Sequence, residues 1–227
     1  SKKHDFASNP ELIDLYKKAL VQLQKFQIVA GKKIDYNYCY PRAKFDRQSI
    51  LWDLNYFKYD FLKLGRIGFD EQLLENEFQK FSEFVASVNT DYFLYRDFQS
   101  RNIMVKDSEI YFIDYQGGRK GALQYDVASL LYDAKAEIPN PLREELLNYY
   151  LDRLESDYKL SRTEFMNSYY AFVLIRIMQA MGAYGFRGLF EKKVHLIKSI
   201  LPARKNLKYL LENGNLDFDI PHLHEVF

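Results

Sequence analysis

The spacing of apolar residues changes twice along this chain, and this pattern constrains the fold more than any other feature. From residue 12 to residue 88, apolar side chains recur mostly at helical intervals. Residues 92–95, 103–105 and 110–113 are instead short apolar or aromatic runs, which are typical of strands. After Gly117-Gly118 the helical spacing returns. The pattern therefore predicts a mainly α fold with a small β-hairpin insert.

Composition excludes several classes of protein. A hydrophobic content of 48% argues against disorder, and a net charge of +1 argues against a nucleic-acid or membrane surface as the main partner. The single cysteine, Cys39, cannot form an internal disulfide bond, and no apolar run is long enough to span a membrane. No apolar signal region follows the first residues. We expect a cytoplasmic protein without a nucleic-acid or membrane partner.

The C-terminal half carries two further signals for helices. Ser161-Arg162-Thr163-Glu164 is a capping box, which predicts that a helix begins there. Gly182, Gly185 and Gly188 are expected to interrupt that helix.

Polar residues gather around the predicted hairpin. If its turn is centred near Asp107 and Ser108, antiparallel pairing places Asn102 opposite Asp114. Asp97 precedes Asn102 by five residues, so a short loop can return it to the same end of the hairpin. Two carboxylates and one amide oxygen are then expected to converge.

Such a set of oxygen ligands suits Mg²⁺, which binds one or two carboxylates together with substrate phosphates. The spacing also matches kinase catalytic loops, in which four residues separate a catalytic Asp from a metal-binding Asn. On this interpretation Asp97 accepts a proton from the attacking hydroxyl, while Asn102 and Asp114 hold the metal. The alternatives are that both aspartates serve only turns and strand ends, or that they belong to a Mg²⁺-dependent hydrolase.

The same residues resemble a known family. Tyr-Arg-Asp-Phe-Gln-Ser-Arg-Asn (95–102) and Phe-Ile-Asp-Tyr-Gln-Gly-Gly (112–118) resemble the C-terminal lobe of the aminoglycoside phosphotransferase and choline kinase-like family. Residues 52–57, 125–130 and 179–188 extend the resemblance over about residues 46–211. Within the family, the chain is most similar to bacterial kinases that phosphorylate the cell-wall sugars N-acetylmuramate and N-acetylglucosamine at the anomeric hydroxyl.

The resemblance implies a role for each matching residue. Asp97 would be the catalytic base, Asn102 and Asp114 the metal ligands, and ATP and Mg²⁺ the cofactors. Arg96 and Asp126 would support the catalytic loop. The chain departs from the family at Tyr95, where a histidine usually precedes the Arg-Asp or Gly-Asp pair.

The family binds ATP between two lobes, and its N-terminal lobe contributes a sheet, a phosphate-covering loop and a lysine. Upstream of Asp97 the sequence shows no Gly-rich loop and no lysine in a strand-like setting. Residues 1–227 are therefore predicted to form a single kinase-like C-terminal lobe whose N-terminal lobe is missing. Its expected parts are a helical acceptor-side segment (1–90), the catalytic loop and hairpin (91–135) and a helical remainder (136–227).

Two groups are candidates for binding the acceptor. By resemblance, Asp53, Asn55 and Tyr56 lie on a helix that faces the acceptor site; alternatively, Asp53 lies on the solvated side of an amphipathic helix. Tyr184 and Arg187, in the Gly-rich stretch, would close the substrate pocket or serve only a structural turn.

A basic stretch near the C-terminus has no acidic residue until Glu212. A solvated helix face is its simplest explanation, and contact with a phosphate or a partner is the alternative. Its basic residues are Lys192, Lys193, His195, Lys198, Arg204, Lys205 and Lys208.

Together these features predict an ATP-dependent phosphotransferase that acts on a hydroxyl of a small sugar-like acceptor, with a cell-wall amino sugar preferred. Aminoglycosides and choline-like alcohols are alternative acceptors. The alternative from another class is a non-catalytic module that binds a sugar or a protein.

Overall fold

A computed structural model describes residues 6, 9–214, 216 and 218–227. These residues form two compact units, each made of two stretches of chain. Unit 1 contains the described residues within 1–45 and 89–167, and unit 2 contains those within 46–88 and 168–227. The chain passes from one unit to the other after residues 45, 88 and 167.

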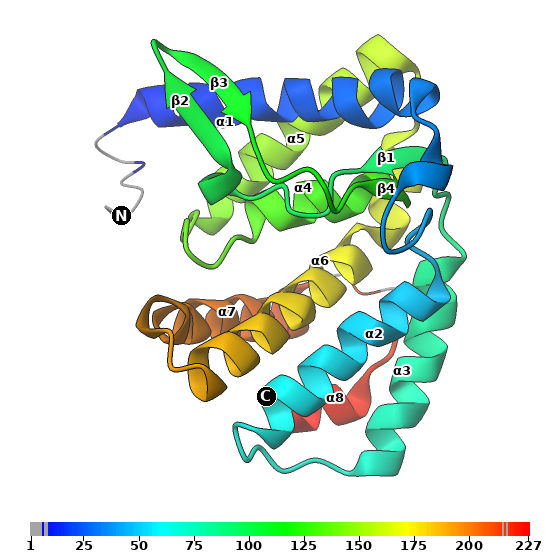
Figure 1. Ribbon diagram of the computed structural model, residues 1–227, viewed down its shortest axis with the longest axis vertical. Coiled ribbons are helices and arrows are strands. Elements are labelled where there is room, and N and C mark those ends of the chain that lie inside the picture. The colour runs from blue at the N-terminus through cyan, green and yellow to red at the C-terminus, as the bar shows by residue number, and fades with distance from the viewer. Residues whose placement is uncertain (1–5, 7–8, 215, 217) are drawn as a thin grey trace. The chain divides into compact units, whose positions relative to one another are not determined.

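Unit 1 combines helices with four short strands (Figure 1). Helix α1 continues as a π-helical segment, η1, and lies against α5. The elements are α1 (Pro10–Gln24), η1 (Lys25–Ala30), η2 (Gly31–Lys33), η3 (Tyr36–Tyr38), β1 (Tyr92–Leu94), η5 (Ser100–Asn102), β2 (Ile103–Lys106), β3 (Glu109–Phe112), β4 (Arg119–Gly121), α4 (Leu123–Leu131), α5 (Asn140–Tyr158) and the start of α6 (Arg162–Tyr184).

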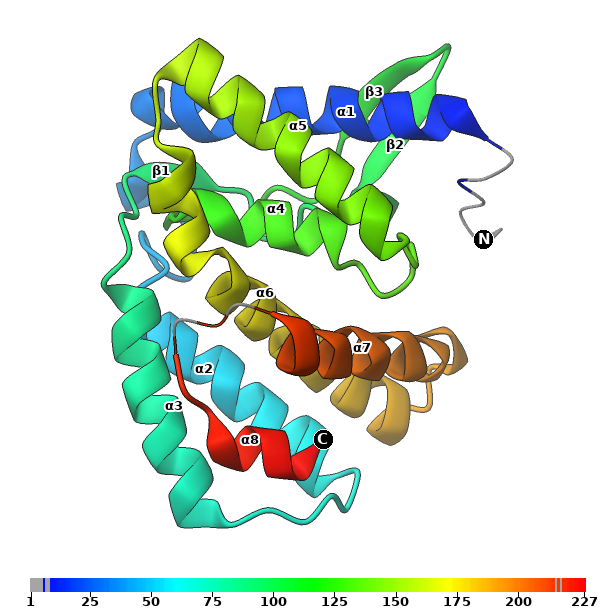
Figure 2. The same cartoon turned by 180° about the vertical axis from the view of Figure 1, so that it is seen from behind.

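The elements described in unit 2 are all helices, joined by loops (Figure 2). Its first two helices lie side by side and begin with aspartate caps: Asp46 accepts from the Ser49 backbone N–H, and Asp70 accepts from that of Leu73. The elements are α2 (Arg47–Phe57), η4 (Lys58–Lys63), α3 (Glu71–Ala86), the remainder of α6, η6 (Gly185–Phe190), α7 (Val194–Asn213) and α8 (Pro221–Val226).

Among the described residues, the named strands form two separate antiparallel pairs. The predicted hairpin is confirmed as β2–β3, with Ile103 opposite Phe112 and a two-residue turn at Asp107 and Ser108. Both turn residues have positive φ (52° and 62°), as a type I′ turn requires. The second pair, β1–β4, was not predicted beyond its first strand.

Buried polar side chains fix α1 and η1 against the rest of unit 1. Gln24 donates from Nε2 to the Tyr150 carbonyl at 2.8 Å. The Tyr150 hydroxyl in turn donates to Gln27 Oε1 at 2.8 Å, and Gln27 Nε2 donates to the Leu123 carbonyl at 3.0 Å. Because these polar groups are buried, each hydrogen bond offsets the cost of removing the groups from water. The bonds also fix the helices in register.

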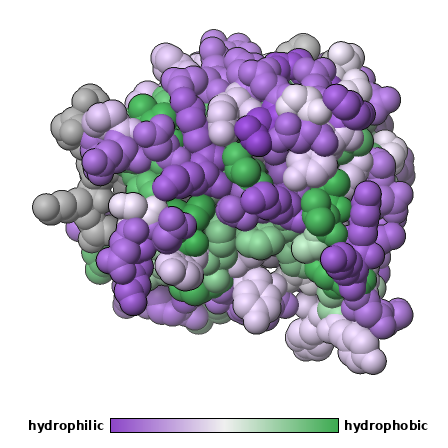
Figure 3. Space-filling view, turned by 90° about the horizontal axis from the view of Figure 1, so that it is seen from above, coloured by the Kyte–Doolittle hydropathy of each residue, from purple (hydrophilic) through white to green (hydrophobic). Residues whose placement is uncertain are grey.

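The surface seen in Figure 3 is mostly hydrophilic, with hydrophobic residues in small separate areas. Among the described residues, no helix combines the length and the apolar character that crossing a membrane requires.

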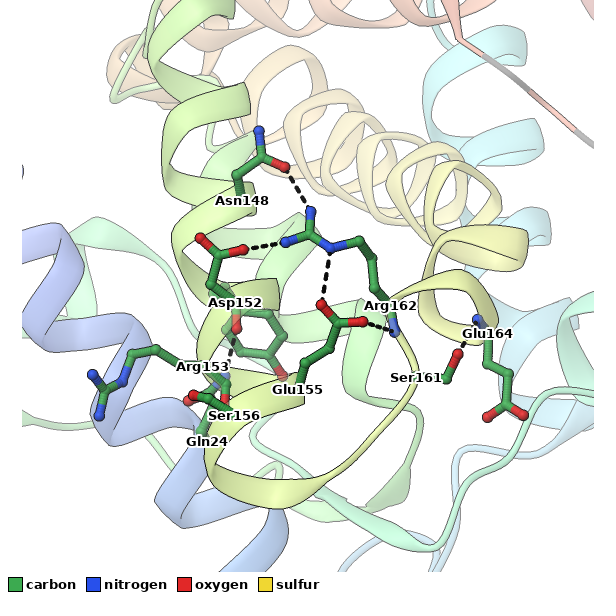
Figure 4. Close-up of polar contacts among 10 residues, drawn as sticks. Gln24, Asn148, Asp152, Arg153, Glu155, Ser156, Ser161, Arg162 and Glu164 are labelled. Atoms are coloured by element: carbon green, nitrogen blue, oxygen red, sulfur yellow. Dashed lines mark hydrogen bonds and ion pairs between the residues drawn. The ribbon is translucent and has the colours of Figure 1, made fainter.

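The connection between α5 and α6 is held by polar contacts around Arg162 (Figure 4). Its guanidinium pairs with Asp152, with Glu155 at 3.3 Å and with Asn148 at 2.9 Å. The Ser161 hydroxyl accepts from the Glu164 backbone N–H at 3.2 Å, which confirms the predicted helix start.

Lys159 ends α5 in the left-handed conformation, with φ 58°. A side chain at this position crowds its own backbone, whereas glycine does not. We therefore expect Lys159→Gly to raise the free energy of unfolding by about 0.5–1 kcal/mol. The shift in urea midpoint measures this gain. Lys159→Ala, which keeps the Cβ, is the control, and a Gly variant no more stable than the Ala variant would contradict the interpretation.

Candidate functional site

The segment after β1 is fixed by a buried carboxylate on α4. Asp126 is fully buried, and its two oxygens accept from the backbone N–H groups of Tyr95 (2.7 Å) and Arg96 (2.9 Å). Arg96 has φ 81°, a conformation that is strained for a residue with a side chain. The two bonds therefore hold a strained turn directly before Asp97.

The Arg96 side chain lies among aromatic rings. Its guanidinium lies 5.0 Å from the centre of the Phe45 ring and 5.1 Å from that of Tyr125, whose hydroxyl accepts from it at 2.6 Å. Such cation–π contacts orient the side chain within unit 1. Arg96 and Asp126 thus lie where support of the loop requires them.

The loop that follows returns as predicted. The Asp97 carbonyl accepts from the Gln99 backbone N–H and from Asn102 Nδ2, both at 2.9 Å. Ser100 donates to Asp133 from both its hydroxyl (2.5 Å) and its backbone N–H (3.2 Å). These bonds place Asn102, which is buried, beside Asp97 at the start of β2.

The predicted pairing of Asn102 with Asp114 was wrong by one residue. Ile113 lies opposite Asn102, because its N–H donates to the Asn102 carbonyl at 3.1 Å. Asp114 follows with φ 71°, so the chain turns out of the β3 ladder at this residue. The carboxylate of Asp114 is exposed at the end of the hairpin, where Gln116 Nε2 donates to Oδ1 at 3.1 Å.

Tyr95 connects the loop to the hairpin end. Its hydroxyl donates to the Ile113 carbonyl at 2.8 Å. Burial raises the pKa of Tyr95 to about 12, and the negative charges of Asp126, Asp114 and Asp97 contribute to this increase. Both carboxylates of the predicted site therefore lie near one phenol.

The oxygens at this site suit a small divalent cation. Asn102 uses Nδ2 for the Asp97 carbonyl, and within the described residues nothing donates to its Oδ1. No basic side chain of the described chain pairs with Asp97 or Asp114. No group of three His, Cys, Asp or Glu residues suited to a metal occurs among the described residues, but Mg²⁺ needs only one or two carboxylates beside substrate oxygens.

The predicted acceptor-binding residues all belong to unit 2. Asp53 is buried, so the alternative that it lies on the solvated side of α2 is wrong. Asn55, Tyr56 and Tyr184 are half-buried, whereas Arg187 is exposed and lies 3.9 Å from Glu191.

Asp60, which the sequence analysis did not identify, lies in the same region of unit 2. Burial raises the pKa of Tyr56, and the Asp60 carboxylate adds to this increase while Arg187 opposes it. Burial also raises the pKa of Asp60. The interval of four residues between Tyr56 and Asp60 places both on one helical face, and this spacing was the signal available in the sequence.

The expected interruption of α6 at the glycines was wrong. The helix runs to Tyr184 and continues as η6, and the glycines instead allow close packing. A Cβ at Gly185 would lie 1.8 Å from the Asp60 carbonyl oxygen, so only glycine fits there. Tyr184 and Arg187 therefore belong to a continuous helical segment rather than to a turn.

Comparison with known proteins identifies a matching family. The model of the phosphotransferase enzyme family matches residues 2–162, which include the Asp97 loop, the hairpin and Asp126. A search of curated proteins found no match. The match covers most of the chain and confirms the resemblance at the level of the family. The chain therefore belongs to the phosphotransferase enzyme family.

Proposed function

We propose that this protein transfers the terminal phosphoryl group of ATP to a hydroxyl of a small sugar-like acceptor, with a cell-wall amino sugar as the preferred substrate. One observation carries the proposal: the Asp97 loop and the Asn102–Asp114 end of the hairpin meet around Tyr95. This arrangement brings a proton acceptor and oxygen ligands for a metal to one end of the hairpin.

Each residue of this group has a separate task in the proposed reaction. Asp97 orients the acceptor hydroxyl and accepts its proton. Asn102 Oδ1 and the Asp114 carboxylate would hold Mg²⁺, which supplies positive charge against the phosphate oxygens. Most of the rate enhancement then comes from positioning and charge stabilisation.

The outer face of the hairpin supports a nucleotide as phosphate donor. Met104 and Tyr111 are directly opposite each other in the ladder, and about half of each side chain is exposed (50% and 55%). An exposed thioether beside an aromatic ring offers an apolar surface on which a planar base can stack. In the family that the chain resembles, an N-terminal lobe completes the nucleotide site.

The polar residues of unit 2 support a hydroxyl- or amino-bearing acceptor. The Asp60 carboxylate accepts hydrogen bonds, Arg187 donates them, and the Tyr56 hydroxyl does both. Asp53, Asn55 and Tyr184 add further polar groups on the same helices. Such a mixture is suited to the alternating donors and acceptors of an amino sugar.

The test of this proposal is a phosphate-transfer assay with the full-length protein, ATP and a panel of acceptors. The panel contains N-acetylmuramate, N-acetylglucosamine, an aminoglycoside and choline. We expect a phosphorylated amino sugar, formed only with Mg²⁺. Release of phosphate without an acceptor would support a hydrolase. If no compound is phosphorylated while an amino sugar still binds, the non-catalytic module replaces the enzyme.

Asp114→Asn tests the metal-binding role separately. Losing one carboxylate charge should raise the Mg²⁺ concentration for half-maximal activity about tenfold or more. Glu109→Gln removes a carboxylate charge at the exposed turn end of the same hairpin and should leave this concentration unchanged. Mn²⁺ should also broaden the backbone NMR signals of residues 113 and 114. A titration that leaves these signals unaffected would refute metal binding at the hairpin.

A further inference from the structure

Helix α7 has two faces of different character. The face that packs within unit 2 is apolar and buried, and it includes Leu196, Ala203, Leu207 and Leu210. Figure 2 shows α7 in front of the C-terminal part of α6, with its other side turned outward. The outward side carries the basic residues that the sequence analysis assigned to a solvated face.

Three apolar residues on this outward side are exposed. The exposed fractions are 62% for Val194, 40% for Ile197 and 61% for Leu201. Their intervals of three and four residues continue through Arg204 and Lys208, which are also exposed. These five residues, here called the α7 seam, follow the a and d positions of a coiled coil. The seam is apolar in its first half and basic in its second.

Basic side chains with no acidic partner or a weak one lie beside the apolar half of the seam and make up its basic half. In the part of the chain that the structure describes, no acidic side chain pairs with Lys198, Arg204 or Lys205. Lys208 lies 3.6 Å from Glu212, but both side chains are mostly exposed, so solvent weakens this pair. The outward side of α7 therefore combines apolar anchors with basic groups available to a partner.

We propose that the α7 seam binds an acidic amphipathic helix of a partner protein. Apolar residues of that helix cover Val194, Ile197 and Leu201, and its Asp or Glu side chains pair with Arg204, Lys205 and Lys208. Helix recognition of this kind uses anchors at intervals of three, four and seven residues, which matches the seam. The charges select an acidic partner and reject a basic one.

A second copy of the chain does not fit this surface. In a parallel pair, Arg204 would face Arg204 and Lys208 would face Lys208, so like charges would repel. In an antiparallel pair centred on the apolar half, a positions would face d positions, so Ile197 would face Leu201 but Val194 would face Arg204. Either arrangement leaves charges without partners of opposite sign.

A membrane surface also fits less well. Helices that lie in a membrane interface bury a broad apolar face along their length. The apolar part of the seam is a narrow stripe that ends at Leu201, and Arg204 and Lys208 then follow on the same stripe. A narrow stripe at a and d positions is the pattern of helix pairing.

The test uses the full-length protein and a synthetic three-heptad helical peptide. The peptide carries leucine opposite Val194, Ile197 and Leu201, and glutamate opposite the basic half of the seam. Fluorescence anisotropy measures its binding. We expect saturable binding that weakens as salt increases, and Leu201→Ser should weaken it about tenfold. The double variant Lys198→Glu/Lys205→Glu should weaken it by a similar factor.

Two matched controls test whether the peptide binds specifically to the α7 seam. Leu73 on α3 is also half-exposed (50%), and Leu73→Ser should leave peptide binding unchanged. A peptide with lysine in place of glutamate should not bind. Equal binding of the two peptides, or full binding to the Leu201→Ser variant, would overturn the proposal. Preferential binding to phosphatidylserine vesicles would replace it with a membrane contact, and Leu201-dependent dimers would replace it with self-association.

Discussion

Asp97→Asn should lower kcat for phosphate transfer by about 10²–10⁴-fold. The amide of asparagine keeps the size of the side chain but cannot accept the hydroxyl proton. The structural role of residue 97 in the loop should be retained, because its backbone carbonyl accepts from the Gln99 backbone N–H and from Asn102 Nδ2 at 2.9 Å. The bond from Gln99 Nε2 to Asp97 Oδ1 is longer, at 3.5 Å, and the Oδ1 atom of asparagine can accept it. We therefore expect a loss of kcat without a comparable loss of stability, measured by the transfer assay and by thermal unfolding.

The matched control for this variant is Asp107→Asn. Asp107 is an exposed residue of the hairpin turn, with φ 52°, and asparagine is well tolerated in this conformation. The control makes the same chemical change in the same hairpin region and should retain full activity. If Asp97→Asn were as active as this control, Asp97 would not be the base.

Asp126→Ala should lower the free energy of unfolding by about 3–5 kcal/mol. The substitution removes the acceptor for two backbone N–H groups and leaves Arg96 in a strained conformation without support. Activity should fall with stability, since Asp97 follows Arg96 directly. Chemical denaturation measures the first effect and the transfer assay the second.

Asp91→Ala is the corresponding control for stability. Asp91 is exposed and pairs with Lys120 at 3.1 Å, so its removal should cost at most about 1 kcal/mol. The free energy of unfolding of the Asp126→Asn variant should lie between those of the unsubstituted protein and of Asp126→Ala, because only one of the two side-chain atoms of asparagine can accept a hydrogen bond. If Asp126→Ala unfolded at the same denaturant concentration as Asp91→Ala, the supporting role of Asp126 would be refuted.

The hairpin shows both the strength and the limit of the sequence pattern. Asp107 and Ser108 were correctly predicted as the turn, because a polar pair between two apolar runs favours one. The relation between Asn102 and Asp114 was missed by one residue, because a two-residue turn at Asp107 and Ser108 sets Ile113, not Asp114, opposite Asn102. The positive φ of Asp114, at which the chain leaves the ladder, has no signal in the strand pattern.

Strand β4 and the burial of polar side chains in unit 2 were harder to predict from the sequence. Arg119–Gly121 is short and mostly polar, and it becomes a strand because β1 lies beside it. Asp53 is buried and Asp60 is partly desolvated, which follows from how helices pack rather than from their own residues. The prediction was sound where short-range pattern determines structure and incomplete where distant segments do.

The interleaving of the two units has a consequence for synthesis on the ribosome. The chain leaves unit 1 at Phe45, whose N–H donates to the Lys120 carbonyl at 2.8 Å, so this bond must wait until residue 120 has emerged. Unit 2 is completed only by residues 168–227, long after α2 and α3 have been made. Those two helices therefore expose apolar surface to the cell while most of the remaining chain is translated, and this interval is when the nascent protein most needs a chaperone.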